Sequence, residues 1–425
     1  MDLDEALERS VRAQIAEAKA AARRLRAAST EEKDAALRAM ARALEAGREA
    51  ILAANAEDVV AAEAKGTRGA LLDRLRLDEA RLAAMAEGLR QIADLPDPVG
   101  RREEARTLPN GLEVARMRIP LGVIAMVYEA RPNVTADAAG LCLKSGNAAV
   151  LRGGTEARRS NAAIARALRA ALTEVGLPKA ALTLLEETDR AAILAVIRQS
   201  DLVDLAIPRG GEGLIRFVVE NARVPVVQHF KGTCHVYVDD AADLGKAHRI
   251  VINAKTQRPG VCNAMECLLV HEAIAARFLP EVGRRLAEQG VELRCDAGAL
   301  AHLEGLEAAV PATDDDWGRE YLDLVCAVKV VADLDEALAH VERYGSHHTE
   351  AIVTEDPEAA GRWLAEVDAS CVVHNASTRF NDGAQLGLGA EMGISTTKMH
   401  AYGPMGLEEL TARKFVVVGD GQIRD

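Results

Sequence analysis

The apolar run at residues 121–128 constrains the fold of this chain more than any other stretch. Its eight residues read LGVIAMVY, a pattern typical of a parallel strand that is buried on both faces. Parallel strands are joined by crossovers, usually helices. Helical patterns at residues 161–172 and 190–199 alternate with strand patterns at residues 148–152, 181–185 and 202–207. The alternation predicts a doubly wound parallel sheet.

A second series of the same kind predicts a second lobe. Strand patterns lie at residues 235–238, 266–270, 327–331, 351–354 and 371–374, and helical patterns at residues 241–253, 272–288, 335–343 and 357–366. A chain of 425 residues is long enough for more than one hydrophobic core. Residues 3 to about 90 are predicted to be helical, because Ser29 and Glu32 make a capping box and one helical face then carries Leu37, Met40, Leu44 and Ile51.

Two further segments predict a β arm. Pro109-Asn110-Gly111 is a turn signal before the alternating residues 112–119, which indicates a protruding hairpin. The last strand pattern, at residues 414–418, has no partner nearby in the sequence. It could complete a neighbouring subunit's sheet together with the hairpin.

The net charge of −13 excludes a general nucleic-acid or acidic-membrane surface, because each needs a clustered basic face. An anionic substrate must then be gathered by a local basic pocket. The seven cysteines form no C-x-x-C pair and the histidines have no metal-ligand spacing, so neither a disulfide framework nor a metal site is expected. With no leader sequence and no membrane-length apolar run, the sequence predicts a reduced, cytoplasmic protein.

The loop at residues 255–264 places Cys262 just after a Pro-Gly corner and just before an apolar strand. A thiol on such a turn can reach a carbonyl carbon while its own N–H binds the developing oxyanion. Cys262 is therefore a candidate nucleophile. A lone cysteine is also often a small buried apolar residue, so the loop alone leaves both interpretations open.

The chain also carries nine ordered motifs that cover nearly its whole length. They are PLGV (120–123), YEARPNVT (128–135), KSGNA (144–148), LRGG (151–154), IPRGG (207–211), CHVYVD (234–239), QRPGVCNA (257–264), HNASTRF (374–380) and GPMG (403–406). These motifs resemble those of the γ-glutamyl phosphate reductase family, in the aldehyde dehydrogenase superfamily.

The resemblance implies an aldehyde-dehydrogenase-like α/β fold with two doubly wound parallel-sheet lobes and a small β oligomerisation arm. Residues 1–103 and 120–231 would form an NADP-binding lobe, and residues 232–385 a catalytic lobe with the nucleophilic cysteine. Residues 104–119 and 386–425 would form the oligomerisation arm and C-terminal segment of a homo-oligomer.

The implied reaction is the NADPH-dependent reduction of L-glutamyl 5-phosphate to L-glutamate 5-semialdehyde and phosphate, in proline biosynthesis. Cys262 would form a thioester that hydride reduces. Asn133 would stabilise the oxyanion, although an Asx turn after Pro132 is the alternative. Hydrolytic aldehyde dehydrogenases need a glutamate base, and the corresponding residues 228–232, QHFKG, offer none. No phosphate-binding P-loop is present, so a separate glutamate 5-kinase is the implied pathway partner.

The cofactor residues implied by the resemblance lie on two loops and one distant carboxylate. No G-x-G-x-x-G is present, and the predicted set is Arg152, Gly153, Glu156, Arg209, Gly210, Gly211 and Glu320. Arg152, with the arginines at 158 and 159, favours a 2′-phosphate and hence NADPH, whereas Glu156 could instead hold the ribose hydroxyls. Glu320 would bind the nicotinamide ribose, or is only an exposed carboxylate at a helix end.

A phosphorylated amino acid needs cations and polar acceptors around it. The candidate substrate residues are Arg131, Lys144, Arg258, Asn375, Ser377 and Arg379. The charged ones could equally form structural ion pairs. Two other functions stay open: another cysteine enzyme of this fold that oxidises an aldehyde or acylates coenzyme A, and a binding protein that has kept the fold without catalysis.

Overall fold

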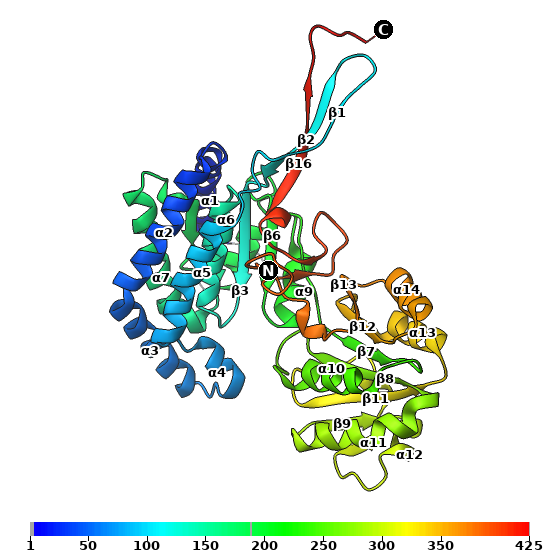
Figure 1. The fold of residues 1–425 in the computed structure, drawn as a ribbon. Coiled ribbons are helices and arrows are strands. Elements are labelled where there is room, and N and C mark those ends of the chain that lie inside the picture. Colours follow the sequence, from blue (N-terminus) through cyan, green and yellow to red (C-terminus); the bar gives the residue numbers. More distant parts are fainter. Residues whose placement is uncertain (1–3, 188, 425) are drawn as a thin grey trace.

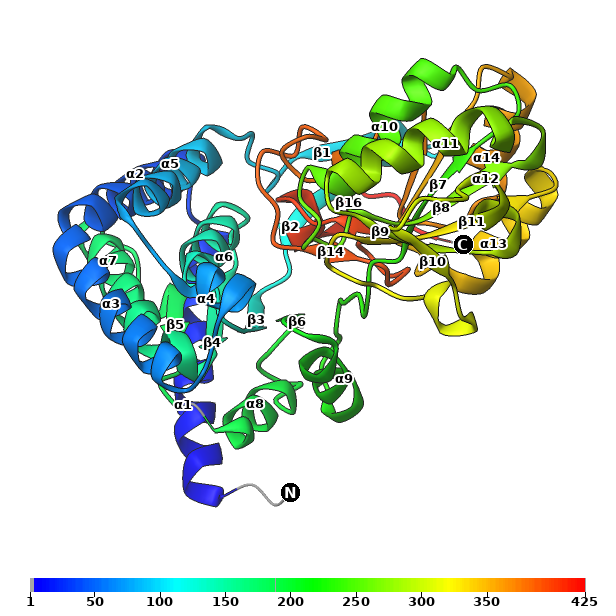
Figure 2. The ribbon, with the colours of Figure 1, turned by 90° about the horizontal axis from the view of Figure 1, so that it is seen from below.

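The computed structural model describes residues 4–187 and 189–424. These residues form two α/β lobes that lie side by side and a narrow β arm that projects away from both (Figures 1 and 2). The C-terminal segment, red in both views, lies between the lobes before it enters the arm. The predicted fold class of two parallel-sheet lobes with a small β arm is confirmed.

The first lobe is built on a parallel sheet with the strand order β5-β4-β3-β6. Its strands are β3 (Val123–Tyr128), β4 (Ala148–Gly153), β5 (Leu182–Leu184) and β6 (Leu205–Arg209). Every residue of β3 is buried. Ile124 joins one hydrophobic core and its neighbour Val123 joins another. Two covered faces explain why the strand is apolar at every position rather than at alternate ones.

Helices cover both faces of this sheet. They are α1 (Glu5–Arg26), α2 (Thr30–Ala46), α3 (Arg48–Ala64), α4 (Gly69–Leu75), α5 (Glu79–Asp94), α6 (Asn133–Lys144), α7 (Arg158–Glu174), α8 (Arg190–Ile197) and α9 (Glu212–Asn221). The predicted capping box is present: Ser29 Oγ accepts a bond from Glu32 N, and Glu32 Oε2 accepts one from Ser29 N. The prediction that Ile51 lies on the same helical face as Leu37, Met40 and Leu44 was wrong. The helix ends before Gly47, and Ile51 belongs to the next helix, α3.

The second lobe is built on a parallel sheet with the order β10-β9-β11-β8-β7-β12-β13. Its strands are β7 (Cys234–Val238), β8 (Met265–His271), β9 (Glu292–Cys295), β10 (Ala309–Pro311), β11 (Val325–Val331), β12 (Thr349–Val353) and β13 (Cys371–His374). Its helices are α10 (Leu244–Thr256), α11 (Glu272–Glu288), α12 (Ala297–His302), α13 (Leu334–Tyr344) and α14 (Pro357–Glu366). The predicted strands are present. The sequence patterns did not predict β10, which is an edge strand, or its neighbour β9.

The arm is an antiparallel sheet with the order β1-β2-β16 (Figure 1). Its strands are β1 (Arg102–Thr107), β2 (Glu113–Pro120) and β16 (Thr411–Val418). The predicted hairpin is β1 and β2. The final strand pairs with β2 of its own chain, from Thr411 opposite Pro120 to Val418 opposite Glu113. The expected strand at residues 414–418 therefore has β2 of its own chain as one partner, and β16 lies at an edge of the sheet.

The C-terminal segment connects the lobes. It forms a short sheet of β14 (Ile394–Ser395) and β15 (Gly403–Pro404). Met405 and Leu407 pack into the core of the first lobe. Lys398 Nζ pairs with Asp368 Oδ2 of the second lobe at 2.5 Å. Among the described residues, no helix is long and apolar enough to cross a membrane.

Candidate active site

Cys262 lies in the turn between α10 and β8 and is partly exposed. Its carbonyl oxygen accepts a hydrogen bond from Cys234 Sγ at 3.1 Å. The backbone of Gly232 packs directly against this turn, because a Cβ at that position would lie 2.1 Å from the Cys262 carbonyl oxygen. Only glycine allows the two backbones to approach so closely. The sequence patterns gave no reason to single out Gly232.

The other cysteines are poor candidates for a nucleophile. Burial raises the pKa of six thiols, namely Cys142, Cys234, Cys267, Cys295, Cys326 and Cys371. A raised pKa lowers the fraction of reactive thiolate at neutral pH. The partly exposed Cys262 thus remains the candidate that the sequence indicated.

Three of the predicted substrate arginines come together near Cys262. Burial, together with neighbouring positive charges that include Arg258, lowers the pKa of Arg131 to about 10, and Cys262 opposes the shift. Burial also lowers the pKa of Arg379. The charge of Arg258 adds to this shift, and Cys262 opposes it. Arg379 is further held by Ser377, whose Oγ accepts a bond from Arg379 N at 3.3 Å. Like charges held together in this way favour a bound anion.

Two more arginines belong to this basic cluster. The charges of Arg209 and Arg74 also lower the pKa of Arg131. Arg209 is the last residue of β6, so it brings a charge of the first lobe to the basic cluster near Cys262. Arg74 of α4 donates from Nη2 to the Gly260 carbonyl of the nucleophile turn at 3.1 Å. Arg74 could not be identified from the sequence, because α4 is far from the catalytic motifs along the chain.

Asn133 is the exposed first residue of α6. The backbone turn that contains Asn133 begins at Arg131, whose carbonyl accepts a hydrogen bond from Val134 N at 3.0 Å. The Asn133 amide donates from Nδ2 to Asp137 Oδ2 at 2.9 Å. Burial raises the pKa of Asp137 to about 6, against the opposing effects of this bond and of Arg209. The amide has a second N–H for another acceptor.

Two other predicted substrate residues make structural contacts. Lys144 is fully buried at the far end of α6, where its Nζ pairs with Asp34 and donates to the Ala93 carbonyl at 2.7 Å. Asn375 has a positive φ of 53° and links two strand ends. Its Oδ1 accepts from Thr354 N at 3.1 Å, and its Nδ2 donates to Thr354 O at 2.9 Å.

The predicted cofactor loop at residues 209–211 lies at the carboxyl end of β6, beside the end of β3. This is the switch point of the sheet, because β4 and β5 lie on one side of β3 and β6 on the other. Ligands of doubly wound sheets bind at such points. Glu129 N donates to Arg209 O at 3.1 Å, and Gly211 N donates to Glu129 Oε2 at 3.0 Å. A Cβ on Gly210 would lie 2.4 Å from Glu129 Oε2.

The remaining cofactor candidates lie along the same edge. Arg152 and Gly153 end β4 and are buried. Burial lowers the pKa of Arg152, and the charge of Glu156 opposes this shift. The Glu156 carboxylate accepts a hydrogen bond from Ala130 N, just after β3. Glu320 lies elsewhere: its Oε1 accepts from Gly232 N at 2.9 Å, which ties it to the nucleophile turn.

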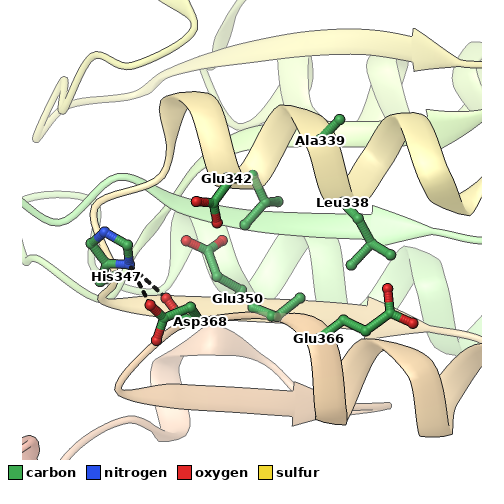
Figure 3. A pocket seen from close by; sticks show the side chains of 9 residues that line it. Leu338, Ala339, Glu342, His347, Glu350, Glu366 and Asp368 are labelled. Carbon is green, nitrogen blue, oxygen red and sulfur yellow. Dashed lines mark hydrogen bonds and ion pairs between the residues drawn. The ribbon is translucent and has the colours of Figure 1, made fainter.

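A cavity of about 240 Å³ lies apart from these residues, beside α13 and α14 (Figure 3). Its lining is rich in carboxylates and comprises Leu338, Ala339, Val341, Glu342, His347, Glu350, Glu366, Val367 and Asp368. His347 Nδ1 pairs with Asp368 Oδ2 at 3.8 Å. An acidic lining repels an anionic substrate, so this cavity does not compete with the basic cluster.

Comparisons with known proteins agree with this architecture. The family model "Aldehyde dehydrogenase family" matches residues 1–315. An acetylating aldehyde dehydrogenase of Geobacillus thermoglucosidasius has a TM-score of 0.70 at 21% identity, over 99% of this chain and 98% of that one, which shows a shared fold. The fold thus defines an aldehyde dehydrogenase-type protein.

Two similar proteins narrow the class. A γ-glutamyl phosphate reductase of Xanthomonas oryzae pv. oryzae is 58% identical over 398 residues, which cover 93% of this chain and 95% of the relative. The crystal structure of γ-glutamyl phosphate reductase from Thermotoga maritima has a TM-score of 0.95 at 46% identity and covers 98% of this chain and 100% of that one. The chain belongs to the γ-glutamyl phosphate reductase family.

Proposed function

We propose that this enzyme reduces L-glutamyl 5-phosphate to L-glutamate 5-semialdehyde and phosphate with NADPH, through a thioester on Cys262, in proline biosynthesis. The observation that carries the proposal is the group of arginines around Cys262 in a chain whose net charge is −13. The overall charge repels an anionic substrate, so the basic cluster marks the place where one binds. Membership of the family supplies the substrate and the pathway.

The first step is acyl transfer. The Cys262 thiolate attacks the carbonyl carbon of the acyl phosphate, the C–S bond forms, and the C–O bond to phosphate breaks. Arg258, Arg131 and Arg379 neutralise the substrate phosphate and its departing charge. The Cys262 N–H and the free N–H of the Asn133 amide stabilise the tetrahedral oxyanion. Asp137 orients that amide.

The first lobe has groups that suit a dinucleotide phosphate. Among the described residues the Gly211 N-cap of α9 offers no side-chain cap. Gly211 N is engaged by Glu129, and the N–H groups that follow it suit a pyrophosphate. A Cβ on Gly153 would lie 2.1 Å from Asn161 Nδ2, so glycine keeps the backbone close at the end of β4. Arg152 and Arg158 supply positive charge for a 2′-phosphate. When bound, NADPH supplies the hydride that reduces the thioester.

The nucleophile's surroundings favour reduction over hydrolysis. Residues 228–232 contain no carboxylate to activate water. The carboxylate of Glu320 is engaged with this loop, because it accepts a hydrogen bond from Gly232 N at 2.9 Å. We therefore propose that Glu320 positions the loop in addition to facing the nicotinamide ribose. We place the amino-acid end of the substrate near Ser377 and Arg379, and leave the Lys144 and Asn375 side chains out of the site.

The substrate and the arm imply partners. An acyl phosphate must be made by a separate kinase, and glutamate 5-kinase is the activity that fits. We also propose a homo-oligomer assembled through the β1-β2-β16 arm, because β16 ends in exposed apolar residues at a sheet edge.

The test is the reverse reaction, the reduction of NADP⁺ by glutamate 5-semialdehyde, measured with and without phosphate for the native enzyme and for Cys262→Ser. We expect activity that requires phosphate and falls at least about 1,000-fold in the variant, because a hydroxyl is not ionised at neutral pH. Phosphate-independent activity would indicate a hydrolytic aldehyde dehydrogenase. A requirement for coenzyme A would indicate an acylating one, and absent NADPH binding would indicate a binding protein.

A further inference from the structure

Two imidazoles flank the thiol of Cys262. One ring nitrogen of His229, one of His348 and Cys262 Sγ all lie within 4.8 Å of one another. The two rings meet edge to face, with their centroids 5.6 Å apart. The three residues come from separate segments: the loop before β7, the nucleophile turn and the approach to β12. The proposed reaction uses Cys262 alone of the three.

In each imidazole a hydrogen bond engages Nδ1, which leaves Nε2 for another ligand. His229 Nδ1 lies 2.9 Å from Ile394 O, and a carbonyl can only accept, so Nδ1 carries the proton and Nε2 has a lone pair. His348 Nδ1 lies 2.7 Å from Thr349 Oγ1. The other His348 nitrogen, Nε2, is buried without a hydrogen-bond partner in the described part of the chain. Metal-binding histidines are typically held in this way, with one nitrogen bonded to the protein and the other free.

We propose that Cys262, His229 and His348 form a site for Zn²⁺ or another thiol-binding divalent ion, which reversibly blocks the nucleophile. Two imidazoles and a thiolate match the protein ligands of zinc sites that keep a fourth position open. The ion displaces the thiol proton to solvent and forms a Zn–S bond, with no change of oxidation state. In a tetrahedral site the ligand atoms lie roughly 3.5 Å apart, so small side-chain rotations bring the three atoms to one ion.

The charges around the site indicate a dissociable ion rather than a permanent one. Arg131 and Arg379 lie within electrostatic range of Cys262 and repel a cation. The carboxylates of Glu320 and Glu391 lie within electrostatic range of His348 and attract a cation. This inference rests on the proposed role of Cys262, because blocking that thiol is what would inhibit the enzyme.

A second group of the same composition offers a comparison. His235, Cys267 and His340 also have ligand atoms within 4.8 Å of one another, and all three are buried. His340 Nε2 lies 3.8 Å from Cys267 Sγ. An ion has no open route to this interior group, whereas Cys262 and His229 are partly exposed. We therefore assign the ion to the site at the nucleophile.

The experiment measures Zn²⁺ binding to the full-length enzyme by competition with a chromophoric chelator, without turnover. It also measures how far Zn²⁺ protects Cys262 from alkylation, read by peptide mass spectrometry. We expect one competing ion per chain, reversal by chelator, and affinity that falls roughly tenfold or more in Cys262→Ala and in His229→Gln. His347→Gln is the matched control, because His347 adjoins His348 but lies at the other cavity, and it should bind as the native enzyme does.

Two results would overturn the assignment: native-like affinity in both Cys262→Ala and His229→Gln, or affinity lost in Cys267→Ala but kept in Cys262→Ala. Both readouts are independent of the reaction. An enzyme that binds Zn²⁺ as expected but lacks phosphate-dependent activity would keep the metal site and overturn only the proposed function.

Discussion

Gly232 is the residue whose substitution tests the nucleophile turn most directly. A methyl group at this position would meet the carbonyl oxygen of Cys262 at 2.1 Å, and backbone atoms cannot swing aside as a flexible side chain can. We therefore expect Gly232→Ala to displace the thiol and lower kcat by at least about tenfold, since small misplacements of reacting groups are costly. The check is the rate of the phosphate-dependent reaction together with the rate of Cys262 alkylation.

Gly88→Ala is the matched control for that change. Gly88 lies in α5, and nothing lies within 4 Å of a Cβ placed there. Alanine also suits a helix interior better than glycine. The control should keep full activity and unfold at an equal or higher temperature. Equal activity in the two variants would mean that the turn tolerates a methyl group at Gly232.

Arg158 tests the choice of cofactor. It is exposed at the start of α7 and has no ion pair among the described residues, whereas Arg159 pairs with Glu57 at 3.0 Å and with Asp58 at 3.4 Å. We expect Arg158→Ala to raise KM for NADPH about tenfold and to leave KM for NADH nearly unchanged, because only NADPH carries the 2′-phosphate. Initial rates with both cofactors measure this. An equal rise for both would separate Arg158 from the 2′-phosphate.

At the scale of single residues, the sequence could indicate the candidate nucleophile but not all of its neighbours. Cys262, Arg131, Arg258 and Arg379 lie in motifs, and the structure brings them together. The partner of Lys144 could not be foreseen, because an aspartate of α2 reaches it only through the packing of distant helices. Positions such as Gly232 depend on how closely two backbones approach, which a residue pattern does not record.

At the scale of elements, burial decided which predictions succeeded. The central strands have long apolar patterns, and β3, β8 and β11 are present as expected. The edge strand β10 and its neighbour β9 have three and four residues, so their patterns are too short to stand out from a loop. β16 was recognisable as a strand, but its pairing with β2 depends on a return of the chain that no local signal specifies.

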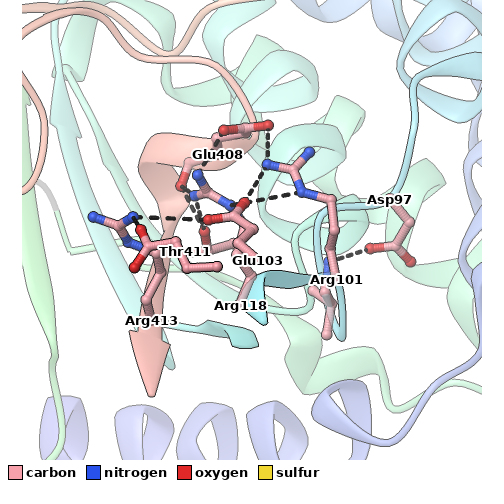
Figure 4. A network of polar contacts seen from close by, with 9 residues as sticks. Asp97, Arg101, Glu103, Arg118, Glu408, Thr411 and Arg413 are labelled. Atoms are coloured by element: carbon pink, nitrogen blue, oxygen red, sulfur yellow. Dashed lines mark hydrogen bonds and ion pairs between the residues drawn. The ribbon is translucent and has the colours of Figure 1, made fainter. Parts of the chain in front are cut away.

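An ion-pair network joins the base of the arm to the C-terminal segment (Figure 4). Glu103 Oε1 lies 2.6 Å from Arg101 Nη2 and 2.7 Å from Arg118 Nε, and Arg118 also pairs with Glu408. The bonds from Arg118 and Arg101 lower the pKa of Glu103 to about 2. A carboxylate with a lowered pKa stabilises the fold above its ordinary pKa, near 4.5, and this contribution is lost as the pH falls toward 2.

We therefore expect Glu103→Gln to lower the Tm at pH 7 and the difference from the native enzyme to shrink as the pH falls from about 5 to 2. Thermal unfolding measured across this range checks the sign. Glu113→Gln is the control, because Glu113 is an exposed residue of β2 without an ion pair in the described chain. A Tm difference that stayed constant from pH 7 to pH 2 would mean that the Glu103 charge does not hold the arm.

At the scale of the whole molecule, the two edges of the arm differ in character. The β1 edge reads REEART and is almost entirely exposed, and such charges discourage pairing with another strand. The outer edge belongs to β16, where Phe415, Val417 and Val418 are 62%, 56% and 48% exposed. An apolar edge strand that projects from the body is a surface for another subunit. The arm thus supports the proposed homo-oligomer.

Val417→Lys tests this assembly, because a lysine on an edge strand opposes pairing. We expect light scattering coupled to size-exclusion chromatography to give a smaller particle than the native enzyme, with the Tm falling as protein concentration is lowered. Val60→Lys makes the same change on α3, at a valine that is 65% exposed on the first lobe, and should leave assembly intact. Equal particle masses for the two variants would place the subunit contact elsewhere than on β16.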